Sequence, residues 1–198
     1  MNKRKEQKLQ TRKHIVKIAK EVFAESGFLS TATSLISTKA GIAHGTLFLH
    51  FPNKEALIIE VLDIELSIIS SEIQKLLEKS YNFEQLLSEY LELIIRQENL
   101  FSVLAKELPF YTDELRRKIL FRESMIRSNF RKALLYDIEE REVKQCDVNA
   151  VVTSVFGTIN YYLSLKHIFV SEGSVISKFK DSILSVCQLL KTEKEGQK

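Results

Sequence analysis

The stretch that decides the fold is ATSLISTKAGIAHGTLFLHFPNKEAL, residues 32–57. Two short segments with apolar positions at helical spacing lie on either side of Gly41. Pro52 closes the second segment, because proline disfavours helix at the residue before it. Two helices joined by a glycine-containing turn within about 20 residues form the helix-turn-helix pattern. The sequence therefore predicts helices over about 34–40 and 43–50.

Both short helices need an inner face that packs against the rest of a small core. In the first helix we expect Leu35, Ile36 and Ala40 to face inward. Beyond Gly41 the apolar residues Ile42, Leu47 and Phe51 are better explained as core positions than as contact residues.

Longer helices flank this unit on both sides. Upstream, apolar residues from Ile15 to Phe23 recur at i, i+3, i+4, i+7 and i+8, and Gly27 suits the left-handed position after the helix, so that Phe28 packs back onto its last turn. Downstream, Asn53 is the expected N-cap of a long helix, with Glu55 in its first turn, where the helix dipole favours an acid.

The remaining chain continues the helical period. We expect helices over 83–95, 99–108 and 113–140, one that begins after the capping residue Asp147 and runs to a break at residues 173–174, and a final one up to Leu190. No segment alternates with period two over a useful length. The predicted fold class is all-α with about nine helices, and 6 Gly and 2 Pro in 198 residues agree with long helices.

Charge is distributed unevenly. Residues 1–54 hold ten basic and three acidic residues, so that part carries +7 and the remainder −4, within a net charge of +3. A basic front on a mildly acidic body predicts that only the front meets a polyanion, although a solvated basic helix face gives the same pattern. No apolar run approaches the roughly 20 residues that span a membrane, and no signal peptide is visible, so we expect a cytoplasmic protein with no membrane partner.

A spaced pattern over about residues 8–60 resembles the tetracycline-repressor (TetR) family of transcription regulators. It is carried by Thr11-Arg12, Ile15, Ala19, Phe23, Gly27-Phe28, Ala40-Gly41-Ile42, the run GTLFLHF at residues 45–51 and the run KEAL at residues 54–57. The resemblance implies a helix-turn-helix DNA-binding domain over 1–53, with its motif at about 32–51, and a ligand-sensing and dimerisation domain over 54–198. It further implies a repressor that binds a pseudo-palindromic operator in double-stranded DNA as a homodimer. The homodimer is expected to form through the last two helices, and a small apolar or amphipathic effector is expected to release the repressor from the DNA.

Nine residues are candidates for DNA contact. Small or polar residues at the start of a recognition helix let its backbone N–H groups approach phosphates, and the residues at either end of the motif are placed to bond the groove walls. The resemblance assigns contacts to most of the same positions. The candidates are Thr33, Ser34, Ala43, His44, Gly45, Thr46, Phe48, His50 and Lys54.

Three positions near the end of the recognition helix stay open. The family usually has tyrosine where Phe48 stands, and a phenylalanine cannot bond a phosphate, so Phe48 packs against sugar or supports the helix. Leu49 either meets a thymine methyl group or simply packs, and His50 either contacts DNA or bonds nearby backbone.

Aromatic residues are frequent in the middle helices. A sensing domain needs a largely apolar cavity with a few polar groups, but plain core packing explains any single aromatic residue as well. The pocket candidates are Tyr90, Phe101, Phe121, Asn129, Phe130, Phe156, Asn160, Tyr161 and His167.

Catalytic chemistry has little support in this chain. There is no phosphate-binding loop, no Gly-x-Ser-x-Gly and no Cys-x-x-Cys, and the four histidines are scattered, so we expect no enzyme activity, no metal and no cofactor. Cys146 and Cys187 are expected to be buried thiols acting as small apolar groups, with a redox role as the alternative. The competing function is a helical protein-interaction dimer in which the helix-turn-helix only packs; the basic front and the small polar run at 43–46 favour DNA.

Overall fold

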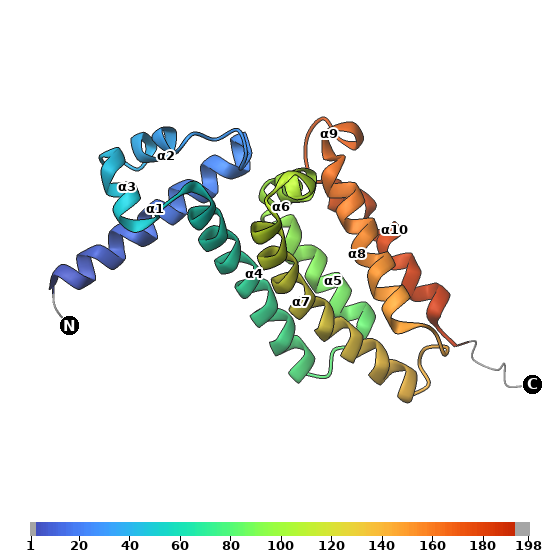
Figure 1. Cartoon of the computed structure of the whole chain (residues 1–198). Coiled ribbons are helices and arrows are strands. Elements are labelled where there is room, and N and C mark those ends of the chain that lie inside the picture. The colour runs from blue at the N-terminus through green and yellow to red at the C-terminus, as the bar shows by residue number, and fades with distance from the viewer. Residues whose placement is uncertain (1–2, 193–198) are drawn as a thin grey trace, which may run out of the picture.

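The computed structural model describes residues 3–192, and within them the fold is all-α, as the sequence predicts (Figure 1). None of the described helices is long and apolar enough to cross a membrane. The elements are α1 (Lys3–Ser26), α2 (Thr33–Lys39), α3 (His44–His50), α4 (Lys54–Glu78), α5 (Phe83–Ile95), α6 (Glu98–Glu107), the 3₁₀ helix η1 (Leu108–Phe110), α7 (Asp113–Glu139), α8 (Val148–Ser164), α9 (Lys166–Phe169) and α10 (Val175–Leu190).

Residues 3–192 contain ten α-helices where about nine helices were predicted, and the difference is one short element. The helix that we expected to run on to Gly173 ends at Ser164, and the four-residue α9 follows it. Predicted caps are present: the Asn53 side chain accepts a hydrogen bond from the Ala56 N–H at 2.8 Å, and the Asp147 side chain caps α8 in the same way.

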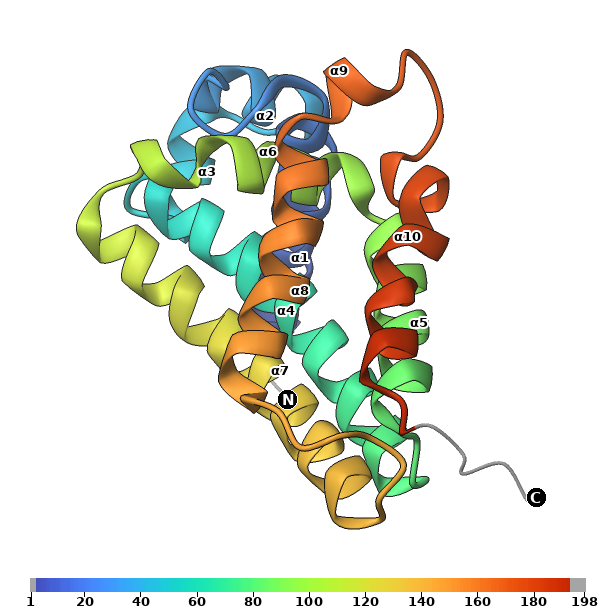
Figure 2. The same cartoon turned by 90° about the vertical axis from the view of Figure 1, so that its right-hand side faces the viewer.

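The first three helices form a small unit at one end of the molecule, and α4 runs from it into a body of α5–α10 (Figures 1 and 2). Helix α1 ends at Ser26, and the next residue, Gly27, has a φ of +88°. The Phe28 ring then packs 4.9 Å from the Phe23 ring, centroid to centroid. In the body α4 packs along α7, and α8 lies against α6 and α10.

The inner face of the small unit agrees with the sequence at all but one position. Ile36, Ala40, Leu47 and Phe51 are buried, and Ile42 is half-buried. The prediction for Leu35 was wrong, since it is 39% exposed. The buried positions of α2 are Ile36 and Ser37, followed by the cap residue Ala40, and they form one narrow face. Leu35 lies one residue to the other side of Ile36, outside that face, and is turned away from the core.

Candidate DNA-binding surface and ligand cavity

The recognition helix α3 presents its first turn to solvent. Ala43, His44 and Gly45 are exposed, Thr46 is half-buried, and a Cβ added at Gly45 meets no atom within 4 Å. Such an open helix start leaves the backbone N–H groups accessible to an approaching anion.

The two helices of the motif touch through their first residues. Thr33 Oγ1 lies 3.0 Å from His44 Nε2, and the His44 ring stands edge-on to the Phe48 ring at 4.9 Å between centroids. Ser34, beside Thr33, is exposed. The structure therefore brings the predicted residues of α2 and α3 together on one polar edge.

Two large apolar side chains of α3 stay in contact with water. Leu49 is 77% exposed and Phe48 is 42% exposed, so neither belongs to the core of the small unit. An apolar side chain exposed on a recognition helix is available to a thymine methyl group or to sugar.

His50 lies at the end of α3, where it is half-buried. Its Nδ1 is buried without a hydrogen-bond partner, and burial, followed by the charges of Lys8 and Arg12, lowers the pKa of the imidazole below its usual value. Proximity to a phosphate would act in the opposite direction by favouring the protonated ring.

Lys54 was expected to reach a phosphate, but its ammonium group already has hydrogen-bond partners within the chain. Its Nζ donates to the carbonyl oxygens of Leu29 at 2.8 Å and Thr31 at 3.2 Å, on the turn between α1 and α2. The ammonium group thereby satisfies carbonyls that have no partner in a helix, and it ties that turn to the start of α4.

Arg12 is a functional candidate that the search for contact residues missed. Its guanidinium pairs with both carboxylate oxygens of Glu60 on α4 at 2.9 Å each, donates to the His50 carbonyl oxygen, and lies 4.2 Å above the Phe51 ring centroid. It fixes the end of α3 against α1 and α4. Its place in the TetR-like motif was the available signal, but periodicity gives a polar residue on α1 no such role.

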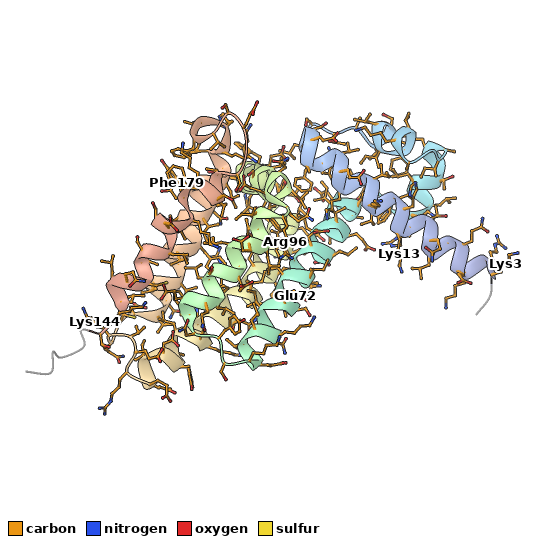
Figure 3. All side chains as sticks on the ribbon, turned by 180° about the vertical axis from the view of Figure 1, so that it is seen from behind. Lys3, Lys13, Glu72, Arg96, Lys144 and Phe179 are labelled. Carbon is orange, nitrogen blue, oxygen red and sulfur yellow. The ribbon has the colours of Figure 1, made fainter. Side chains whose placement is uncertain are left out.

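Basic side chains surround this unit. Figure 3 shows Lys3 and Lys13 projecting from α1 at the end of the molecule away from the body. Beside the end of α3 lies a hollow of about 300 Å³ lined by Lys5, Lys8, Leu9, Arg12, Leu49 and His50. Three cations of the predicted basic front, Lys5, Lys8 and Arg12, thus lie next to the recognition helix.

A cavity of about 60 Å³ lies inside the body, between α4, α5, α6, α7 and α8. Four of the predicted pocket residues line it, namely Tyr90, Phe101, Phe156 and Asn160, together with Leu66, Ile94, Leu104, Ala105, Leu108, Glu123, Ile126 and Leu163. This composition, apolar with a few polar groups, is typical of a small-molecule site.

The other predicted pocket residues lie elsewhere. Phe130 is fully buried behind the cavity, with its ring 5.4 Å from that of Tyr90 and 5.2 Å from that of Phe156. Phe121 and Tyr161 are 64% and 54% exposed. Asn129 is half-buried on α7 and does not line the cavity, and His167 lies in a separate surface groove beside α6 and α9.

A half-buried acid in the cavity wall, Glu123, was not predicted. Glu123 pairs with Arg127 at 3.0 Å, and burial raises the pKa of its carboxyl group although the arginine opposes the shift. The Arg127 guanidinium lies 5.1 Å from the Phe156 ring centroid, and its buried Nε has no hydrogen-bond partner. Glu123 occupies the inward stripe that holds Ile119, Ile126 and Phe130, so a charge in that stripe was the signal.

Two further kinds of site, a metal-binding cluster and a reactive thiol, are absent from the residues that the structure describes. No group of three or more His, Cys, Asp or Glu is placed to hold a metal among residues 3–192. Burial raises the pKa of the Cys187 thiol to about 12, and the pKa of the half-buried Cys146 is also raised. Both thiols are therefore poor sources of the reactive thiolate.

A basic helix-turn-helix at one end and an apolar cavity in a helical body at the other define a transcription regulator that binds DNA and responds to a ligand. Residues 15–61 match the family model described as "Bacterial regulatory proteins, tetR family". The chain is 30% identical over 154 residues to the fatty acid metabolism regulator protein of Bacillus subtilis (strain 168), covering 74% of this chain and 78% of that protein. The chain belongs to the TetR family of DNA-binding transcription regulators, which are not enzymes.

Two solved structures and a further sequence relative agree with this assignment. The FadR regulator from Bacillus subtilis in complex with stearoyl-CoA is 25% identical, with a TM-score of 0.75 over 87% of this chain and 95% of that one. The FadR regulator from Bacillus halodurans, at 20% identity, shares the fold with a TM-score of 0.76 over 89% of this chain and 93% of that one. The regulator UidR of Escherichia coli (strain K12) is 42% identical over 52 residues, 26% of each chain.

Proposed function

We propose that this regulator is a dimeric repressor that binds a pseudo-palindromic operator and is released by a long-chain fatty acyl-CoA. The observation that carries the proposal is the exposed polar start of α3 beside α2, combined with an apolar cavity in the body. The relative crystallised with stearoyl-CoA supports this choice of effector class.

Within the motif we assign two kinds of contact. His44, at the open start of α3, reads base edges, and Phe48 packs against sugar. Ala43, Gly45 and Thr46 let backbone N–H groups of α3 approach phosphates. Thr33, Ser34, His50 and Lys54 position the protein on the phosphates of the groove walls. Lys54 does so with its ammonium group already aligned by the α1–α2 turn.

These roles are tested by DNA retention. The wild-type protein first selects DNA from random-sequence oligonucleotides, and its affinity for the selected DNA is then measured at rising salt concentration. This affinity should fall steeply with salt, because neutralisation of phosphates by the protein releases counterions. Lys54→Ala should weaken binding to all sequences alike, whereas His44→Ala should change the preference among sites. Salt-independent retention, or equal effects of both variants on every site, contradicts the assignment and favours a protein-interaction module.

The dimer is proposed to form through α8 and α10, with 1–53 as the DNA-binding domain and 54–198 as the sensing and dimerisation domain. These two helices lie side by side on the flank of the body away from α2 and α3 (Figures 1 and 2). On α8 the exposed residues Ser154, Gly157, Thr158 and Tyr161 recur at helical spacing. A two-fold pair would present two copies of α3 to half-sites about 34 Å apart.

Gly157 offers a direct test of this interface. A Cβ there meets nothing within 4 Å in one chain, so Gly157→Arg fits a monomer but obstructs a helix packed against α8. We expect sedimentation to report a monomer with lost operator affinity, and Ser124→Arg on the exposed side of α7 to remain a dimer. A dimeric Gly157→Arg variant refutes this interface.

The effector class is tested by thermal shift. A cavity of about 60 Å³ is smaller than the roughly 300–1,000 Å³ typical of ligand sites, so binding requires expansion. Stearoyl-CoA should stabilise the protein and release DNA, whereas CoA alone should do neither. No stabilisation by any acyl-CoA between C8 and C18 refutes this effector class.

A further inference from the structure

The turn between α1 and α2 is held by one carboxylate from the body. Glu107, the last residue of α6, accepts at a single oxygen, Oε2, from the N–H groups of Phe28 and Leu29 at 3.0 Å each. The Tyr111 hydroxyl donates to the same oxygen at 3.3 Å. A Cβ at Gly27 would lie 2.5 Å from Glu107 Oε1, so the approach depends on glycine there.

The same turn is held from its other side by α4. Lys54 binds the carbonyl oxygens of Leu29 and Thr31, while Glu107 binds the N–H groups. The α1–α2 turn is therefore held by two opposite charges that come from two different helices. If α6 moves relative to α4, the turn must follow it or lose the hydrogen bonds to Glu107.

Helix α6 is also a wall of the cavity. Phe101, Leu104 and Ala105 line the cavity from the turns that lead to Glu107, and Leu108 lines it from the next residue. A ligand larger than the present cavity has to displace part of its wall, and α6 together with Leu108 supplies a third of the residues in that wall. A displacement of the last turn of α6 moves the Glu107 carboxylate.

The start of α6 is anchored more firmly than its end. Glu98 is 4% exposed, accepts from the N–H groups of Val175 and Ile176 at 3.0 and 3.1 Å, and pairs with Lys166 at 2.8 Å. The end of α6, by contrast, carries the half-buried Glu107 and passes into a 3₁₀ turn containing the exposed Pro109. Expansion of the cavity therefore falls on the Glu107 end.

We propose that Glu107 is a positioning residue that holds the helix-turn-helix in its DNA-binding arrangement and lets go of the α1–α2 turn when an acyl chain fills the cavity. This rests on the proposed function above. Effector and DNA then compete through one equilibrium, because each favours a different position of α6. The carboxylate contributes only to the DNA-binding state, so its removal favours the effector-bound state.

The test measures DNA release by stearoyl-CoA. Glu107→Ala should lower the stearoyl-CoA concentration for half-release of the selected DNA about tenfold, equivalent to about 1.4 kcal/mol. Without stearoyl-CoA, the variant should lose less than tenfold in DNA affinity. Glu107→Gln, which keeps an acceptor oxygen without the charge, should fall between this variant and wild type. Lys106→Ala, an exposed neighbour on the same turn, is the matched control and should behave as wild type. A half-release concentration that is unchanged or raised in Glu107→Ala overturns the proposal.

Hydrogen exchange gives a second readout in the wild-type protein. Saturation with stearoyl-CoA should speed the exchange of the Phe28 and Leu29 amides, and unchanged protection of both amides overturns the proposal. Failure of the proposed function looks different, because then the wild-type protein itself neither retains DNA nor releases it with stearoyl-CoA.

Discussion

Replacement of Arg12 by alanine should destabilise the helix-turn-helix unit. The arginine makes three kinds of contact at once: a two-pronged pair with Glu60, a hydrogen bond to the His50 carbonyl, and a stack on the Phe51 ring. These contacts join α1, α3 and α4. Their loss removes the bonds through which Arg12 ties the end of the recognition helix to α1 and α4.

The magnitude follows from the exposure of each contact. The Arg12–Glu60 side chains are each 35% exposed, so their pair contributes about 0.5–1 kcal/mol, as exposed pairs do. The cation over the aromatic ring adds about 0.5–1 kcal/mol, and the charged donor to the carbonyl adds about 1.5 kcal/mol. We expect Arg12→Ala to lower the free energy of unfolding by about 2.5–3.5 kcal/mol.

The assay is urea denaturation of the variant and of two comparisons. Lysine cannot reproduce the planar fork, so Arg12→Lys should recover less than half of the loss. Lys13→Ala, an exposed neighbour on α1, should change the free energy of unfolding by less than about 0.5 kcal/mol. If Arg12→Ala loses no more than Lys13→Ala, the clamp has no energetic role and the reasoning fails.

Three further predictions concern the turn and the cavity. Gly27→Ala should cost at least about 1–2 kcal/mol of unfolding free energy, because φ is +88° there and the new Cβ meets the Glu107 carboxylate; a neutral result in urea denaturation contradicts this. Glu123→Gln should stabilise the protein at pH 7.5, and the gain should vanish well below the usual glutamate pKa. Burial raises the Glu123 pKa in the folded protein, so the charge begins to oppose folding as the pH rises above the usual glutamate pKa and does so fully above the raised pKa. If the variant and the wild type differ in unfolding free energy by the same amount at pH 7.5 and at the low pH, the charge of Glu123 does not oppose folding. Ala105→Leu adds three carbons to a wall of a cavity of about 60 Å³ and should raise the stearoyl-CoA concentration for DNA release at least tenfold; release at the wild-type concentration places the ligand elsewhere.

Sequence reasoning located the candidate DNA surface better than the cavity. Thr33 and His44, two separate candidates for DNA contact, meet because both sit at the starts of short helices whose turn contains Gly41. In the body, a count of aromatic residues did not separate the inward from the outward face of each helix. Phe121 lies off the stripe that contains Ile119 and Ile126, and attention to that stripe would have excluded it.

What the sequence by itself determined are the helices, their ends and the helix-turn-helix. These depend on neighbours within one or two turns: the left-handed glycine at 27, the cap at Asn53, the proline at 52 and the 3.6-residue spacing of apolar side chains. Only the tertiary structure decided that Glu107 meets the N–H of Phe28, 79 positions earlier in the chain, and that Glu123 borders a cavity built from five helices. Such contacts arise from how whole helices pack. The stripe on α7 indicates that position 123 faces inward, but no local pattern shows which partners or which cavity a glutamate meets.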